Sequence, residues 1–439
     1  MRSLGNAAAP QLLPDLAPAP RGLARTFLLA MLLLVPTLSA VMFWPDPNMG
    51  PTLLALRFNS GPVLIAEVVF IALSGISLRH EFLRLPKTVR WAAAVWLLFV
   101  AASCFNIQNI ALGIVKTAGW IIHSWFALSL IACLRKHGGS GDAVKAFVGG
   151  ALVCVVPVAL FFALFDGEPF WRWRDLVPGF LNVRHFGFYM SVAAILSFFA
   201  AWSTSSEIRD GKATESNIAW LCVAVICAAA VMWSGSRAGL LSIVVAFSAV
   251  VLFVPAMRSW RVAAIFAGVL TVALALSQLH VIPDKDFSIF RFSQVEGMDG
   301  LNGLDEYSSG RLEMWLETTR AIGGKPLIGH GSGQAVSYLA TLNKDYGQPH
   351  NGTLQFLFEW GVIGGLAGLF LLARPFWTLL STRTLITPLQ AGAAAGGITI
   401  LVNGHLDAAL YHPWPLVIYI LCMTIAVIPG GEMDSTKAS

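Results

Sequence analysis

Apolar runs long enough to cross a membrane recur along the whole length of this 439-residue chain. Hydrophobic residues make up 56% of the sequence and charged residues 12%, about half the charged share of a soluble globular protein. An apolar run of about 17 to 25 residues spans the hydrocarbon core as one α-helix, which satisfies its own backbone hydrogen bonds there. The sequence therefore predicts an all-α, polytopic membrane protein.

We expect about twelve transmembrane helices within one domain, residues 26–429. The predicted spans are 26–44, 62–78, 91–107, 109–133, 144–165, 185–203, 217–233, 238–254, 262–280, 352–373, 385–403 and 414–429. The Pro- and Ala-rich residues 1–25 are predicted to be a disordered tail, and residues 430–439 a second, short tail. Residues 281–351 form the long loop of the domain.

The basic residues predict the orientation of the spans. With both termini in the cytoplasm, cytoplasmic segments hold 17 of the 29 Lys and Arg residues, as the positive-inside rule expects. The 281–351 loop is then periplasmic. Within it, the segment RLEMWLETTRAI places Leu312, Trp315, Leu316 and Thr319 on one helical face, which predicts an amphipathic helix on the membrane surface.

Two composition features exclude other classes of site. All six cysteines lie in or at the ends of apolar segments, without a C-x-x-C spacing, so neither a disulfide framework nor a cysteine metal site is indicated. The net charge of +5 reflects membrane topology rather than nucleic-acid binding.

Basic residues from separate parts of the chain map to the exported edge of the membrane. They are Arg184 and His185, Arg237, Arg311, and His350 with Asn351. Positive charge on that side opposes the usual bias, and the arginine fork suits phosphate oxygens. The pattern predicts an anion site for lipid phosphate or pyrophosphate. The alternative for Arg237 is a topology anchor that reaches the headgroups.

His350 is the candidate general base, because a neutral imidazole accepts a hydroxyl proton near pH 7. A structural polar residue at the helix start is the alternative. Asn351 is expected to cap the following helix. Glu359, nine residues after His350, needs a partner inside its span, and we expect it to pair with an arginine of another helix in a structural role.

Other polar groups give weaker signals. Asp284 and Asp286 form a D-x-D pattern in the exported loop, and His405, Asp407 and His412 share the last exported loop. We interpret the second group as interface residues rather than metal ligands. No P-loop, G-x-S-x-G or H-E-x-x-H motif is present, and no cofactor or metal is predicted.

Three stretches together resemble the O-antigen ligase and Wzy polymerase superfamily. They are SGSRAGLL at 234–241, SSGRLEMW…KPLIGHGSG at 308–333 and HNGTLQFLFEWGVIGG at 350–365. The resemblance implies a metal-independent, inverting GT-C glycosyltransferase of the bacterial inner membrane with a periplasmic active site. Its donor would be an undecaprenyl-pyrophosphate-linked glycan.

Carried over by position, the resemblance makes Arg237 and Arg311 the pyrophosphate ligands and His350 the residue that activates the acceptor. Arg184 falls where members often carry another basic residue. The layout and short tails favour a ligase, with lipid A-core as acceptor, over a polymerase. A protein O-oligosaccharyltransferase would have a large C-terminal periplasmic domain. A transporter or flippase, the alternative from another class, would place polar groups near the membrane midplane.

Overall fold

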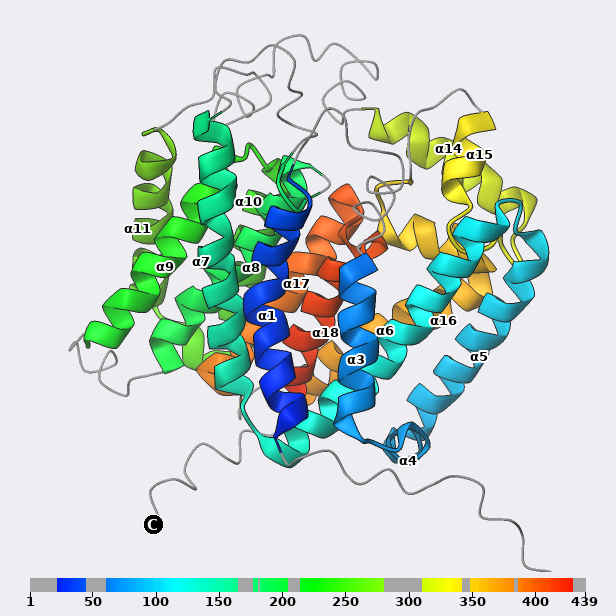
Figure 1. Ribbon diagram of the computed structural model, residues 1–439, viewed down its shortest axis with the longest axis horizontal. Helices are drawn as coiled ribbons and strands as arrows, with labels where there is room; N and C mark the ends of the chain where they lie inside the picture. Colours follow the sequence, from blue (N-terminus) through cyan, green and yellow to red (C-terminus); the bar gives the residue numbers. More distant parts are fainter. Residues whose placement is uncertain are drawn as a thin grey trace, which may run out of the picture.

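The chain is a bundle of α-helices (Figure 1). The computed structural model describes residues 22–44, 61–164, 177–180, 182–203, 214–279, 310–341, 348–382 and 386–428. Within these ranges the ordered elements are α-helices and short 3₁₀ turns, with one isolated β-bridge between Val177 and Phe180. The predicted all-α class is confirmed. The predicted tails lie largely or wholly outside the described residues.

Every predicted span contains a helix. In the described part of the chain, eight helices are long and apolar enough to cross a membrane: α1 (Leu23–Met42), α5 (Lys87–Ser103), α6 (Ile110–His137), α7 (Ser140–Leu164), α8 (Val183–Ser203), α9 (Glu215–Trp233), α11 (Trp260–Ser277) and α16 (Gly352–Ser381). A ninth span results if α3 (Gly61–Ser74) and α4 (Leu78–Arg84), bent by 88°, count as one. The chain is a multi-pass membrane protein.

The other three predicted spans are α10 (Arg237–Phe253), α17 (Pro388–Asp407) and α18 (Pro413–Val427). Helices α10 and α18 are apolar but shorter than 18 residues. Helix α17 is rich in Gly and Ala and packs against α8, α10 and α18. Small residues allow this close approach, since a Cβ added at Gly396 would lie 2.7 Å from Cys422 Sγ. Helices α8 and α18 are the most buried helices of the core.

Two short helices from the long loop lie at one end of the bundle, next to the beginning of α16 (Figure 1). They are α14 (Arg311–Gly324) and α15 (Ala335–Thr341). Helix α14 packs on α16 and buries Met314, Thr318 and Ala321. Leu312 and Leu316 of the predicted apolar face are exposed. Trp315 departs from the expected surface role, because its indole N–H donates to the Pro349 carbonyl at 2.9 Å.

Helix α16 is broken at Gly361, whose φ of 70° and ψ of 178° are not helical. A loop from the GHGSG stretch enters the break. The backbone N–H of His330 donates to Phe358 O at 2.8 Å, and that of Gly331 to Glu359 O at 2.9 Å. Val362 N–H donates back to Pro326 O at 2.8 Å. The loop therefore satisfies the backbone groups that the break would leave unpaired.

Candidate functional site

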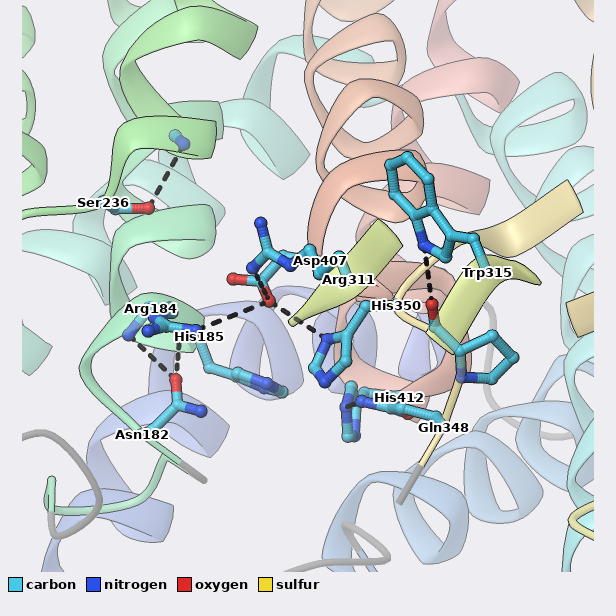
Figure 2. Close-up of polar contacts among 12 residues, drawn as sticks. Asn182, Arg184, His185, Ser236, Arg311, Trp315, Gln348, His350, Asp407 and His412 are labelled. Carbon is cyan, nitrogen blue, oxygen red and sulfur yellow. Dashed lines mark hydrogen bonds and ion pairs between the residues drawn. The ribbon is translucent and has the colours of Figure 1, made fainter. Parts of the chain in front are cut away.

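Asp407, the last residue of α17, is the centre of a polar cluster at the same end of the bundle (Figure 2). Its Oδ1 lies 2.8 Å from Arg311 Nη2, 3.1 Å from His350 Nδ1 and 3.9 Å from Arg184 Nη1. These partners come from α14, the turn before α16, and α8. Arg184, Arg311 and His350, all predicted to bind an anion or activate the acceptor, therefore contact the carboxylate of Asp407. The sequence had indicated Asp407 only as an interface residue.

The charge balance of this cluster is positive. Asp407 is buried, and burial alone would raise the pKa of its carboxyl group. The contact with His350 and the charges of Arg311 and Arg184 outweigh this effect, so the pKa of Asp407 lies well below its usual range. The carboxylate therefore stays ionised near neutral pH. One negative charge faces two permanent guanidinium charges, which leaves the cluster able to attract an anion.

Each predicted basic residue lies at the beginning of a helix. Arg184 is the second residue of α8, Arg237 and Arg311 are the first residues of α10 and α14, and His350 precedes α16 by two residues. Side chains cap three of these helices. Asn182 Oδ1 accepts from Arg184 N–H at 2.9 Å, Ser236 Oγ from Gly239 N–H at 3.2 Å, and Asn351 Oδ1 from Leu354 N–H at 3.1 Å. Asn351 therefore caps α16, as the sequence predicted.

These positions are electrostatically unfavourable without an anion. A helix N-terminus carries a partial positive charge, so arginine there is disfavoured by roughly 0.3–1 kcal/mol at exposed sites. Three arginines are placed at such positions, with Asp407 at the negative end of α17. Helix N-termini and guanidinium groups both favour the same ligand, an anion with several oxygens. The arrangement fits a phosphate or pyrophosphate group.

The backbone on both sides of the His350–Asp407 contact is unusual. His350 has a φ of 50° and Ala408, which follows Asp407, a φ of 57°, and among the described residues these are the non-glycine positions with positive φ. Left-handed backbone at a non-glycine residue is costly and persists where surrounding structure enforces it. Here the indole of Trp315 binds the residue before His350, so α14 holds this backbone in place.

The beginning of α16 is fixed against the end of α17 by small residues and one hydrogen bond. A Cβ at Gly352 would lie 3.2 Å from Gly404 O, so the two backbones approach closely. The Thr353 hydroxyl is 2.9 Å from His405 Nε2. These contacts explain why His350, two residues before α16, reaches Asp407 at the end of α17.

Two further histidines lie beside His350. The rings of His185 and His412 are 4.3 Å apart, edge to face, and His412 Nε2 is 3.3 Å from Gln348 Nε2. Burial, together with the nearby His185, Lys116 and His350, holds the pKa of His412 well below its usual range. His412 is therefore neutral near pH 7. It joins the 408–412 turn to the predicted supporting residue His185 (Figure 2).

Arg237 lies at the same end of the bundle. The turn before it packs tightly on the first turns of α8, since a Cβ at Gly187 would lie 2.6 Å from Ser236 Cβ. In α10, Ser242 Oγ accepts from Asn403 Nδ2 of α17 at 2.9 Å. The helix that Arg237 begins is thus fixed to both α8, which carries Arg184, and α17, which carries Asp407.

Glu359 is not part of the Asp407 cluster, and its partners differ from the expected arginine. Its Oε1 accepts from the backbone N–H of Gly333 at 2.9 Å and from Gln355 Nε2 at 2.6 Å. The nearby cationic side chain is Lys116 of α6, whose ammonium lies 3.7 Å from the centre of the Tyr411 ring. Glu359 therefore helps to hold the 329–333 loop in the break of α16.

His405, Asp407 and His412, which share the last predicted exported loop, do not come together around one point. His405 bonds Thr353 and Leu401 O, and His412 contacts Gln348, so each has its own partners apart from Asp407. Over the described ranges, no three His, Cys, Asp or Glu side chains are grouped as metal ligands. Asp284 and Asp286 lie outside the described residues.

Sequence reasoning missed the roles of Asp407, His412 and Asn182. One signal pointed to Asp407: it is an acid at the end of an apolar span, on the same predicted edge as the arginines. Which arginines it meets depends on tertiary contacts between α8, α14 and α17, and no sequence spacing encodes those contacts.

Part of the chain matches a known protein family. Residues 222–371 match the family model of the O-antigen ligase domain, Wzy_C, while no curated protein gives a significant match to the chain. The matched region holds Arg237, Arg311, His350 and Glu359 and both halves of α16 up to Leu371. The match covers 150 of the 439 residues, and over this region the chain is similar to O-antigen ligases.

Proposed function

We propose that this protein is an O-antigen ligase of the GT-C type. It transfers O-antigen polysaccharide from undecaprenyl pyrophosphate to a sugar hydroxyl of lipid A-core, at the periplasmic face of the inner membrane. The observation that carries the proposal is the meeting of Arg184, Arg311 and His350 at Asp407, at one end of the bundle. A transporter would instead concentrate its polar groups near the membrane midplane.

The arginines suit the donor. A guanidinium group has five N–H donors, and Arg311 uses one of its terminal nitrogens on Asp407. Arg311 and Arg184, with Arg237 at the start of α10, would hold the pyrophosphate oxygens. As the bond to the sugar breaks, negative charge grows on the leaving pyrophosphate. Fixed arginines stabilise that charge without a metal ion.

His350 suits the acceptor. Its Nδ1 faces Asp407 at 3.1 Å, and a carboxylate at Nδ1 favours the proton on that nitrogen. Nε2 is then the nitrogen that can accept a proton. In the proposed step, Nε2 takes the proton of the acceptor hydroxyl while the hydroxyl oxygen attacks the anomeric carbon of the donor sugar. The bond from that carbon to the pyrophosphate oxygen breaks, the anomeric configuration inverts, and undecaprenyl pyrophosphate leaves.

The experiment that tests the proposal is deletion of the gene followed by gel analysis of lipopolysaccharide. A ligase deletion should remove all O-antigen bands from lipid A-core and leave lipid-linked polymer to accumulate. Core carrying a single repeat unit would instead assign the chain to the Wzy polymerases, which use the same donor. Unchanged bands with normal polymer would contradict both assignments.

The proposal also includes metal independence. The purified protein should transfer glycan at an unchanged rate in EDTA, because arginines supply the positive charge. Loss of transfer in EDTA, with recovery on adding Mg²⁺ or Mn²⁺, would contradict metal independence and favour a metal site at Asp284 and Asp286.

A further inference from the structure

A groove with a volume of about 500 Å³ lies in the membrane-spanning part of the bundle. Helices α5 and α16, which pack along one another, form one side. Helices α6 and α18, which also pack together, form the other side, and α4 closes one end. We call this the α5–α6 groove. The Asp407 cluster does not line it.

The α5–α6 groove is apolar along most of its length. Its inner end is formed by Trp96, Trp120 and Trp360, which pack edge to face. From Trp120 to Arg135, both of which line it, α6 rises about 22 Å at roughly 1.5 Å per residue. The groove thus covers most of one hydrocarbon core of about 30 Å. These dimensions suit a lipid chain.

The other end of the groove carries positive charge. Arg135 and Arg374 both line it, at the end of α6 that lies away from Tyr411 and the Asp407 cluster. Glu81 is shared between two arginines, since its carboxylate is 2.8 Å from Arg84 and 3.3 Å from Arg135. Arg374 donates to the Thr378 hydroxyl and has no carboxylate partner among the described residues. Positive charge therefore exceeds negative charge at this mouth.

We propose that the α5–α6 groove binds one anionic phospholipid of the leaflet opposite the Asp407 cluster. Its phosphate would bind Arg135 and Arg374, and an acyl chain would lie between α6 and α16. Guanidinium groups bind phosphate oxygens in charge-assisted, often bidentate hydrogen bonds. The lipid would fill space between two helix pairs, and so stabilise the position of α16 relative to α6. This site does not depend on the proposed transfer reaction.

Native mass spectrometry of the purified full-length protein tests the proposal. The protein is titrated with phosphatidylglycerol or with phosphatidylcholine of the same acyl chains. We expect one phosphatidylglycerol to bind about tenfold or more tightly than phosphatidylcholine. The double variant Arg135→Gln/Arg374→Gln should remove that preference, because the two arginines attract the net negative headgroup of phosphatidylglycerol, whereas the choline ammonium offsets the phosphate charge of phosphatidylcholine.

Two further variants make the test specific. Arg258→Gln changes an exposed arginine that does not line the groove, and it should bind phosphatidylglycerol like the wild type. Ala127→Trp places a large ring in the groove and should weaken binding of both lipids while both arginines remain. Equal binding of the two lipids by the wild type would overturn the proposal. Displacement of the bound lipid by a polyprenyl phosphate would also overturn it and make the groove a donor-chain site.

Discussion

His350 Nδ1 lies 3.1 Å from Asp407 Oδ1, and left-handed backbone occurs at His350 itself and at the residue after Asp407. This contact joins the turn before α16 to the end of α17. It orients the imidazole, so that one nitrogen faces the carboxylate and the other is available to an acceptor. Arg184 and Arg311 contact Asp407 directly. Arg237 begins α10, which packs against α8 and α17.

Asp407→Asn should lower turnover by about 10²–10⁴-fold, the usual range for loss of general-base function. The amide keeps the size of the side chain but no longer favours a proton on His350 Nδ1. It also leaves Arg311 without its counter-charge, so donor binding should be retained or strengthened. The measurement is glycan transfer by the purified variant, alongside binding of undecaprenyl-pyrophosphate glycan. Wild-type turnover in Asp407→Asn would show that the carboxylate does not orient the base.

Lysine should not replace Arg237 or Arg311. Lysine keeps the positive charge but loses the planar fork that binds two phosphate oxygens. Both Arg237→Lys and Arg311→Lys should therefore weaken donor binding as well as turnover. Arg261→Lys, on the first turn of α11, is the matched control and should behave like the wild type. Full activity of either site variant would mean that the arginine acts only as a topology anchor.

Gly361→Ala should destabilise the protein by about 1–3 kcal/mol and reduce transfer. The Gly361 backbone conformation is accessible almost only to glycine, and a Cβ there would overlap the Leu327 carbonyl oxygen. The loop would then leave the break in α16. Gly268→Ala, on α11 with nothing within 4 Å of the added Cβ, is the control. Thermal unfolding in detergent measures both, and equal midpoints would contradict the assigned break.

Glu359→Gln should mainly lower stability or expression, because Glu359 holds the 329–333 loop. If Lys116 contributes the compensating charge, the effects of Glu359→Gln and Lys116→Met will not add. A double-mutant cycle of unfolding free energies should give a coupling of about 0.5–3 kcal/mol. Additive effects would show that the two charges act independently. Unchanged stability of Glu359→Gln, with lost turnover, would instead indicate a catalytic role for the glutamate.

The helices were predictable from the sequence because spanning a membrane is a local requirement on apolar length. Each of the twelve predicted spans contains a helix, although α10 and α18 are shorter than 18 residues. The break in α16 was not predictable, since Gly361 lies inside the single predicted span 352–373. The break depends on hydrogen bonds from the 326–331 segment, which is distant in the sequence.

The basic residues of the site were predictable for a related reason. A positive charge on the exported side is unusual wherever it occurs, so Arg184 and Arg311 could be singled out individually. Asp407 was not assigned to the site, because one acid at the end of a span has many possible partners. Its importance follows from the convergence of three helices, which is a property of the packing.

Separating donor binding from turnover in His350→Ala tests the central claim most directly. If His350 is the general base, the folded variant should bind undecaprenyl-pyrophosphate glycan nearly as well as the wild type. Its turnover should fall by about 10²–10⁴-fold, while Arg311→Ala should lose donor binding. If His350→Ala instead loses donor affinity as severely as Arg311→Ala, His350 is a phosphate ligand, and the His350–Asp407 pair does not activate the acceptor.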